Sequence, residues 1–123
     1  MPEPRILVVE DEDDVRNYLE TVLVEAGYEV DVVATAEDAR ALLGKGRYKL
    51  VIADWWLSDG TGLTIVDEAV NRGAKTFLLS GHVIKLLGDN ARRHSLLRKP
   101  IAPSELVAAV QRAIGVPTDN AEA

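Results

Sequence analysis

Five polar residues at the ends of apolar runs are able to do chemistry in this sequence. They are Glu10, Asp11, Asp54, Ser80 and Lys99. In the stretch LVIAD, an apolar run ends on the Asp54 carboxylate, and two tryptophans follow at once. Carboxylates that lie within a few ångströms of one another resist joint ionisation unless a cation lies among them. A fold that brings these side chains together would therefore form a cation site.

Mg²⁺ is the cation that this set of ligands favours. Only oxygen ligands are present near the acids in sequence, and Mg²⁺ binds through one or two carboxylates, keeps several waters and accepts phosphate oxygens. The Ser80 hydroxyl is able to donate to a phosphoryl oxygen, and the Lys99 ammonium is able to neutralise its charge. The set therefore suits phosphoryl transfer onto a carboxylate, because that chemistry depends on in-line positioning and charge neutralisation.

The elements that must position these residues include five strands. They are predicted over residues 5–10, 29–33, 50–54, 75–80 and 95–99. The first and third are apolar almost throughout, as expected of strands that are buried on both faces of a parallel sheet. The second alternates around Asp31, which places it nearer an edge.

Helices are predicted between the strands, over residues 15–26, 36–44, 63–72 and 103–114. Thr35 is suited to be the N-cap of the second helix, and Gly27 and Gly115 stand where helices commonly end. The apolar periodicity is interrupted over residues 83–93, so a helix there should be short or irregular.

Strands that alternate with helices predict a three-layer α/β domain, since right-handed crossovers place helices on both faces of a parallel sheet. Ligands bind such sheets beyond the carboxyl ends of the strands. All five candidate residues stand at these ends, so they should converge on one rim. The order of the strands does not follow from periodicity.

Composition limits the classes of protein that fit. The 123 residues suffice for one domain, predicted over residues 4–115, with a flexible tail over 116–123. No apolar stretch approaches the roughly 18 residues that span a bilayer, and the run at 6–9 is too short for a signal peptide. We therefore expect a cytoplasmic protein without cysteine chemistry or membrane insertion. The net charge of −6 disfavours direct nucleic-acid binding.

The sequence resembles the response-regulator receiver domains of two-component signalling, in their stand-alone, chemotaxis-regulator-like form. Four stretches carry the resemblance, in the order VVEDE, DWWLSDGTG, LLSGH and RKP, and each stands at a predicted strand end. The resemblance covers residues 5 to about 115. It implies a flavodoxin-like (βα)5 fold with a five-stranded parallel sheet in the order 2-1-3-4-5. It also implies a signalling phosphoacceptor that catalyses only its own phosphorylation and dephosphorylation.

Carried over position by position, the resemblance implies a role for each candidate residue at the metal. Asp54 would be the phosphoacceptor. Mg²⁺ would be held by Glu10, Asp11, Asp54 and the backbone carbonyl of Trp56.

The resemblance also implies the remaining roles and the partners. Ser80 and Lys99 would contact the phosphoryl group, and a cis peptide bond would join Lys99 to Pro100. The phosphoryl donor would be a sensor histidine kinase or a histidine phosphotransfer protein. Phosphorylation would change binding of an unknown downstream protein, or of a second copy through the fourth helix, fifth strand and fifth helix.

Departures from the family pattern leave alternatives open. Leu96 stands where the family has its switch aromatic, the interval from Ser80 to Lys99 is shorter than usual, and Ser58 replaces a proline. The first two favour a constitutive, phosphorylation-independent interaction module of the same fold. A flavin-binding electron carrier of similar topology is disfavoured, because the stretch EDEDD would repel a phosphate. No output domain is expected beyond Gly115.

The aromatic residues beside Asp54 and a nearby histidine complete the candidate entrance to the site. Trp55 is expected to be a partly exposed packing residue. We hypothesise that Trp56 limits the access of water to phosphorylated Asp54 and so slows its hydrolysis. His82 is expected to be an exposed loop residue close to the same entrance.

Overall fold

The computed structural model describes residues 5–81 and 95–117. The strands are β1 (Arg5–Val9), β2 (Glu29–Val33), β3 (Leu50–Asp54), β4 (Trp56–Leu57), β5 (Gly60–Thr61), β6 (Lys75–Ser80) and β7 (Ser95–Arg98). The helices are α1 (Asp13–Glu25), α2 (Ala36–Lys45), α3 (Gly62–Asn71) and α4 (Pro103–Ile114). No helix in these two ranges is long and apolar enough to cross a membrane.

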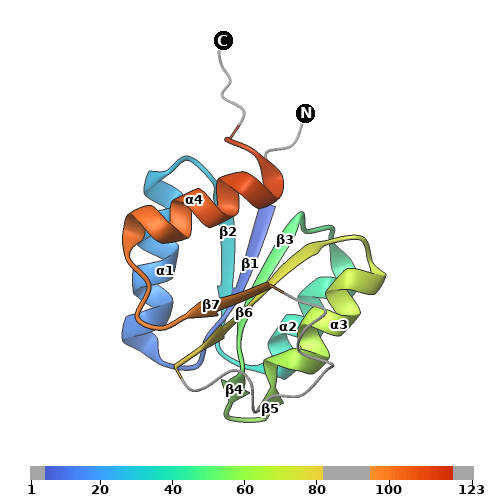
Figure 1. Cartoon of the computed structure of the whole chain (residues 1–123). Helices are drawn as coiled ribbons and strands as arrows, with labels where there is room; N and C mark the ends of the chain where they lie inside the picture. Colours follow the sequence, from blue (N-terminus) through green and yellow to red (C-terminus); the bar gives the residue numbers. More distant parts are fainter. Residues whose placement is uncertain (1–4, 82–94, 118–123) are drawn as a thin grey trace.

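Five parallel strands form one sheet in the order β2-β1-β3-β6-β7. Counted along the chain as the five long strands, this is the order 2-1-3-4-5 that the resemblance implied. The edge position expected of the alternating second strand is confirmed. Figure 1 shows α1 and α4 on one face of the sheet and α2 and α3 on the other, which confirms the three-layer α/β architecture.

Two apolar clusters fill the spaces between the layers. Leu7 and Val9 of β1 face the cluster under α2 and α3, whereas Ile6 and Val8 face the cluster under α1 and α4. All four side chains are fully buried. Strands buried on both faces need apolar residues at every position, and the continuous apolar runs of the sequence follow from that requirement.

The predicted helices form within two residues of their expected bounds. The Thr35 hydroxyl accepts a hydrogen bond from the backbone N–H of Asp38 at 3.1 Å, which confirms this N-cap. Gly27 follows α1 with a φ of 101°, a conformation that favours glycine over residues with a side chain. The irregular helix expected over residues 83–93 and the loop position expected of His82 lie outside the described residues.

Two strands are one residue shorter than predicted, although the backbone N–H groups of Glu10 and Lys99 still donate to the neighbouring strands, to the carbonyls of Val33 and Ser80. β1 ends at Val9 rather than at Glu10, and β7 ends at Arg98 rather than at Lys99. The side chains of Glu10 and Lys99 then meet as an ion pair.

A short antiparallel hairpin of β4 and β5 follows Asp54, and strands of two residues are too short for periodicity to predict. Its turn carries Asp59, whose carboxylate oxygens accept hydrogen bonds from the backbone N–H groups of Ala36 and Glu37 at 2.8 and 3.0 Å. These are free donors in the first turn of α2. The hairpin beside Asp54 is thereby joined to α2.

We expect Asp59→Ala to lower the thermal midpoint at neutral pH. The two backbone hydrogen bonds lower the pKa of Asp59 below its ordinary value of 3.8. Because the pKa of Asp59 is lower in the folded than in the unfolded protein, its ionised carboxylate adds to the free energy of unfolding at pH values above the unfolded-state pKa. This contribution is lost as the pH falls through the folded-state pKa. Thermal unfolding from pH 7 down to about pH 3 should therefore show the difference between parent and variant shrinking. Asp38→Ala, an exposed acid in the same turn, should show no such trend, and a difference that is constant with pH would contradict the assignment.

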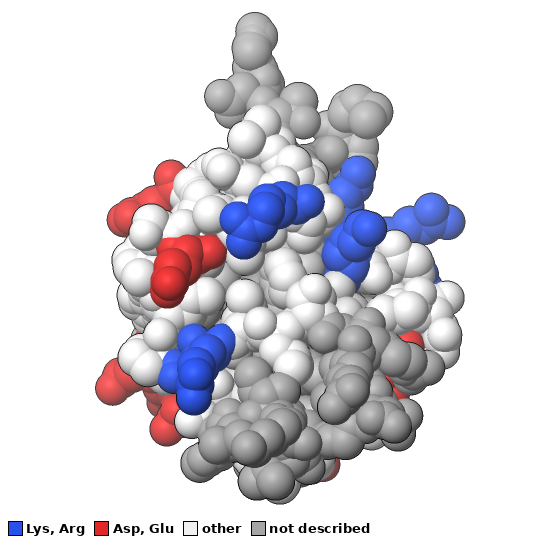
Figure 2. Space-filling model, in the orientation of Figure 1, with Lys and Arg blue, Asp and Glu red and all other residues white. Residues whose placement is uncertain are grey.

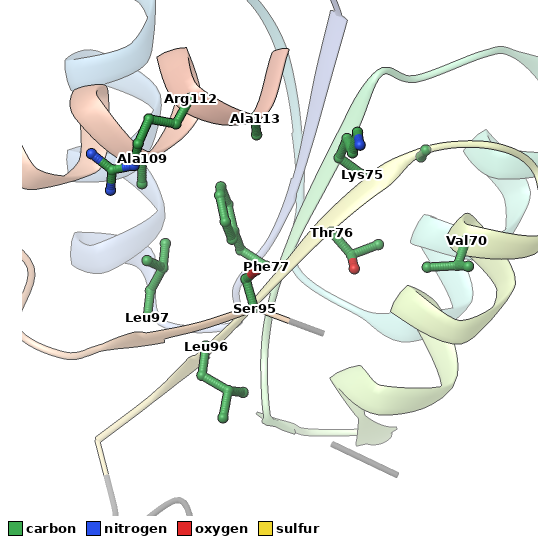
Figure 3. A pocket seen from close by; sticks show the side chains of 11 residues that line it. Val70, Lys75, Thr76, Phe77, Ser95, Leu96, Leu97, Ala109, Arg112 and Ala113 are labelled. Carbon is green, nitrogen blue, oxygen red and sulfur yellow. The ribbon is translucent and has the colours of Figure 1, made fainter. Parts of the chain in front are cut away.

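Leu96, at the position of the expected switch aromatic, lies on β7 and is half-buried. It packs against the cluster under α2 and α3, whereas the adjacent Leu97 packs against the cluster under α1 and α4. Figure 3 shows the two side chains pointing in opposite directions beside an open hollow that Phe77 and Ala109 also line. Leu96 is therefore integrated into the fold as an aliphatic packing residue.

Candidate functional site

Three acids meet beyond the carboxyl ends of β1 and β3. Carboxylate oxygens from Glu10, Asp11 and Asp54 all lie within 4.8 Å of one another. Glu10 is fully buried and Asp54 is 8% exposed, whereas Asp11 is only half-buried. β1 and β3 are neighbours in the sheet, so acids more than forty residues apart in sequence share one rim.

Lys99 inserts its ammonium group among these acids. Its Nζ atom lies 2.9 Å from Oε1 of Glu10 and 3.2 Å from Oδ2 of Asp54, to which it donates a hydrogen bond. Glu12 is more distant, at 4.0 Å. The peptide bond from Lys99 to Pro100 is cis, as the resemblance implied. The lysine therefore balances part of the negative charge that the acids bring to the rim.

Burial and mutual repulsion set the electrostatics of the site. Burial raises the pKa of Glu10, and the ammonium of Lys99 only partly opposes this. Burial likewise raises the pKa of Asp54 against the opposing effect of Lys99, and the charge of Asp11 raises it further. Burial disfavours the ammonium form of Lys99, but the two carboxylates outweigh this and raise its pKa. An additional cation would stabilise the ionised acids.

Ser80 and Gly62 frame Asp54 from neighbouring elements. Ser80 is buried at the end of β6, one residue beyond Leu79, which pairs with Asp54 in the sheet. Gly62 starts α3 directly against the backbone of Asp54. A Cβ atom at Gly62 would lie 2.1 Å from the carbonyl oxygen of Asp54. Only a glycine allows this close approach.

The loop that carries the first two acids is held by two contacts that the sequence did not indicate. Arg16 of α1 donates a hydrogen bond to the backbone carbonyl of Glu10 at 3.0 Å and also pairs with Asp13. The backbone N–H of Glu12 donates to Oε2 of Glu10 at 3.1 Å. The spacing of Arg16 and Asp13, one helical turn apart, was the only available signal, and it does not reveal the carbonyl contact.

The two tryptophans beside Asp54 differ in exposure. Trp55 is 8% exposed and belongs to the core cluster under α2 and α3, so the expectation that it is partly exposed was wrong. Trp55 directly follows Asp54, the last residue of the buried strand β3, and its backbone N–H donates a hydrogen bond to the carbonyl of Leu79 in β6. Trp56 is 58% exposed, and its ring stands perpendicular to that of Trp55 with centroids 6.3 Å apart.

The donor set fits a small hard cation. All of its side-chain ligands are carboxylate oxygens. Burial raises the pKa of Glu10 and of Asp54 more than the Lys99 ammonium lowers it, so a further positive charge would stabilise these two carboxylates. Mg²⁺ prefers such oxygen ligands and retains waters that a half-open rim can admit. The three acids predicted from sequence to bind a metal are thus brought together, and Trp56 begins β4 two residues beyond Asp54.

Comparison with known proteins agrees with this geometry. The family described as "Response regulator receiver domain" matches residues 6–111. The transcriptional regulatory protein CusR of Escherichia coli is 35% identical over 114 residues, which cover 87% of this chain and 49% of CusR. PcoR, also of Escherichia coli, is 34% identical over 112 residues, which cover 87% of this chain and 50% of PcoR. The chain thus spans about half the length of these curated relatives.

Solved structures show the same fold. The response regulator TrrA of Thermotoga maritima, determined in complex with Mg²⁺ and BeF, superposes with a TM-score of 0.81 at 30% sequence identity. The superposition covers 89% of this chain and 98% of TrrA. Because the family match extends over most of the sequence and the acid rim stands where the fold binds ligands, the chain belongs to the response regulator receiver domains, the phosphoacceptors of two-component signalling.

Proposed function

We propose that Asp54 is the residue of this receiver domain that accepts the phosphoryl group. The observation that supports the proposal is the position of its carboxylate, 3.2 Å from the Lys99 ammonium and in one cluster with Glu10 and Asp11. Among the described acids of this cluster, Asp54 alone combines near-complete burial with a strand end flanked by Ser80 and Trp56.

In the proposed reaction, a carboxylate oxygen of Asp54 attacks the phosphorus atom of a phosphohistidine. The new O–P bond forms as the N–P bond breaks, and the electron pair returns to the imidazole nitrogen. Lys99 neutralises charge on the transferred group, and the Ser80 hydroxyl donates to one of its oxygens. These roles require positioning more than covalent chemistry, as is general for phosphoryl transfer.

Receiver domains typically use Mg²⁺, and we assign its ligands here to Glu10, Asp11, Asp54 and the carbonyl of Trp56. When bound, Mg²⁺ supplies positive charge to the phosphoryl oxygens. The raised pKa values of Glu10 and Asp54 mean that a cation has to compete with protons for these carboxylates as the pH falls, so phosphorylation should weaken toward acidic pH.

We assign the donor to a sensor histidine kinase or a histidine phosphotransfer protein. Beside Lys99, an open hollow of about 600 Å³ is lined mainly by apolar groups, including Val15 and Tyr18 of α1 and Ile101. Such a surface suits the apolar face of a helix that presents a histidine to Asp54. The downstream partner, and a homodimer through the expected fourth helix, β7 and α4, remain predictions, and the expected fourth helix lies outside the described residues.

Intact mass measurement tests the proposed phosphoacceptor. We expect the parent, incubated with Mg²⁺ and acetyl phosphate, to gain one phosphate-sized increment. Asp54→Asn should gain none, because the side-chain amide of asparagine is a far weaker nucleophile than a carboxylate. Excess chelator should abolish the gain in the parent. Asp38→Asn, an exposed acid of α2 away from the acid cluster, is the matched control and should behave as the parent. No gain in the parent would favour the constitutive interaction module instead.

Trp56→Asn should accelerate loss of the phosphoryl group several-fold. The large exposed ring follows Asp54 by two residues, and a smaller polar side chain would admit attacking water. The rate is measured by following the phosphorylated mass after removal of the donor. Trp56→Phe keeps aromatic bulk and should stay close to the parent. An unchanged rate in Trp56→Asn would remove the hypothesis.

A further inference from the structure

A basic hollow of about 860 Å³ lies at the end of the sheet opposite to the acid site, where the strands begin. Its charged lining consists of Arg5, Glu29, Arg47, Lys49, Arg72 and Lys75. Figure 2 shows lysine and arginine side chains gathered at the upper right, near the end where β1 and β3 begin in Figure 1. Five of the chain's 14 basic residues thus line one hollow, although the net charge is −6.

Three of these cations stand where neighbouring strands begin. The backbone N–H of Lys49 donates to the carbonyl of Arg5, and that of Lys75 donates to the carbonyl of Lys49, both at 2.9 Å. Lys75 pairs with Leu50 in the sheet register, one residue beyond Lys49. Adjacent strands are about 4.8 Å apart, so these three strand starts extend over about 10 Å. The sheet therefore sets where the three backbone positions stand around the hollow.

Part of this charge has no acidic partner among the residues that the structure describes. Arg5 pairs with Glu29 and Asp31 at 3.3 and 3.7 Å, and Arg72 pairs with Glu68 at 3.1 Å. Over residues 5–81 and 95–117, no carboxylate lies within 4.0 Å of the basic groups of Arg47, Lys49 or Lys75. All three side chains are exposed. An anion in the hollow would relieve their mutual repulsion.

The helix ends around the hollow indicate which kind of anion fits. Gly73 follows the C-terminus of α3, and Ala113 and Ile114 end α4. The free carbonyls of helix C-termini carry partial negative charge, whereas compact phosphate groups are bound by helix N-termini. Cations near helix C-termini interact favourably with these carbonyls. This interaction explains why basic residues stand at Arg47 and Arg72, but it does not explain Lys49 and Lys75, which stand where strands begin.

We propose that this hollow binds an extended acidic segment of a partner protein. Side chains on one face of an extended segment recur at about 7 Å, so two carboxylates of such a segment fit within the roughly 10 Å over which the three strand starts extend. Carboxylates spread along a peptide reach the cations one by one and avoid concentrating charge against the helix carbonyls. The surface lies at the opposite end of the strands from Asp54, so it offers a second contact that leaves the phosphoacceptor accessible.

A titration of the ¹⁵N-labelled full-length chain with an octaglutamate peptide at low ionic strength tests the proposal. Amide shifts should concentrate at Arg47, Lys49 and Lys75. The double variant Lys49→Glu/Lys75→Glu should bind the peptide at least tenfold more weakly. Arg40→Glu/Arg98→Glu makes the same change in net charge away from the hollow and should weaken binding less than twofold. Equal urea midpoints of the two double variants show that both are folded.

Four results would overturn the proposal. Equal weakening in both double variants would mean that the peptide senses only net charge. Tighter binding of tripolyphosphate than of the peptide at the same amides would assign the hollow to a phosphate ligand. A tenfold gain in affinity on Asp119→Asn/Glu122→Gln would identify the chain's own acidic tail as the occupant. Self-association that the Lys49→Glu/Lys75→Glu variant abolishes would identify a second copy.

Discussion

Lys99→Met should destabilise the fold by about 3 kcal/mol near pH 7 in the absence of Mg²⁺, the cost typical of removing one partner of a buried ion pair. The ammonium lies 2.9 Å from the fully buried carboxylate of Glu10 and 3.2 Å from that of Asp54. Without it, two buried carboxylates face each other with no cation. Urea unfolding of parent and variant in chelator measures the difference directly.

The pH dependence of this loss has a definite sign. Burial already raises the pKa of Glu10 and of Asp54, and removing Lys99 takes away the main opposing influence, so both pKa values should rise further. When the folded-state pKa exceeds the unfolded-state pKa, stability falls as the pH rises through the interval between them. The deficit of the variant should therefore be small near pH 4 and largest at neutral pH.

The response to Mg²⁺ is a second measurement on the Lys99→Met variant, beside the pH dependence of its stability. A cation that binds only the folded state stabilises it in proportion to its affinity. Millimolar Mg²⁺ should recover more stability in Lys99→Met than in the parent, because no ammonium competes for the acids. Lys45→Met, at an exposed position in the last turn of α2, should depend on neither pH nor Mg²⁺ in this way. A deficit that is equal at both pH values and insensitive to Mg²⁺ would contradict the charge balance described for this site.

Gly62→Ala should cost about 3 kcal/mol or more, in the upper range for overpacking a close contact. The added Cβ would lie 2.1 Å from the carbonyl oxygen and 3.0 Å from the carbonyl carbon of Asp54, and 3.1 Å from the Cβ of Ala53. The nearest two atoms belong to backbone and are not able to rotate away. Either α3 or the end of β3 must move, so the variant should also take up phosphate poorly.

Gly44→Ala is the matched control, with the opposite sign expected. Gly44 lies within α2, and no atom lies within 4 Å of the Cβ that alanine would add. Glycine inside a helix costs roughly 0.5–1 kcal/mol relative to alanine, so this variant should gain about that much. Urea midpoints of both variants separate the close contact from helix propensity. A midpoint for Gly62→Ala at or above that of the parent would refute the contact.

The sequence was sufficient for the secondary elements and for the class of chemistry. Apolar β-branched runs and helical periodicity are local properties, because they reflect which faces of each element are buried. The candidate acids could be recognised for the same reason, since Asp54 ends an apolar run and Glu10 and Asp11 follow another. The prediction about Trp55 failed because periodicity treats a residue beyond a strand as loop, whereas Trp55 packs in the core cluster under α2 and α3.

Contacts between elements depended on information that no local pattern contains. Asp59 caps α2 from a turn 23 residues away, and Lys99 reaches Asp54 across 45 residues. Contacts between residues so far apart in sequence depend on strand order and on the path of each crossover, which the family resemblance implied and periodicity did not. The meeting of Arg5, Lys49 and Lys75 around one hollow has the same origin.

The sequence by itself thus determined which residue types stand at each strand end, since burial requires an apolar strand and solvent permits charge beyond it. Only the tertiary structure decided which ends are neighbours, because hydrogen bonding between strands sets their order and register. At one end of the sheet this order gathers acids around Lys99, and at the other it brings together Arg5, Lys49 and Lys75, of which the two lysines have no carboxylate within 4.0 Å among the described residues.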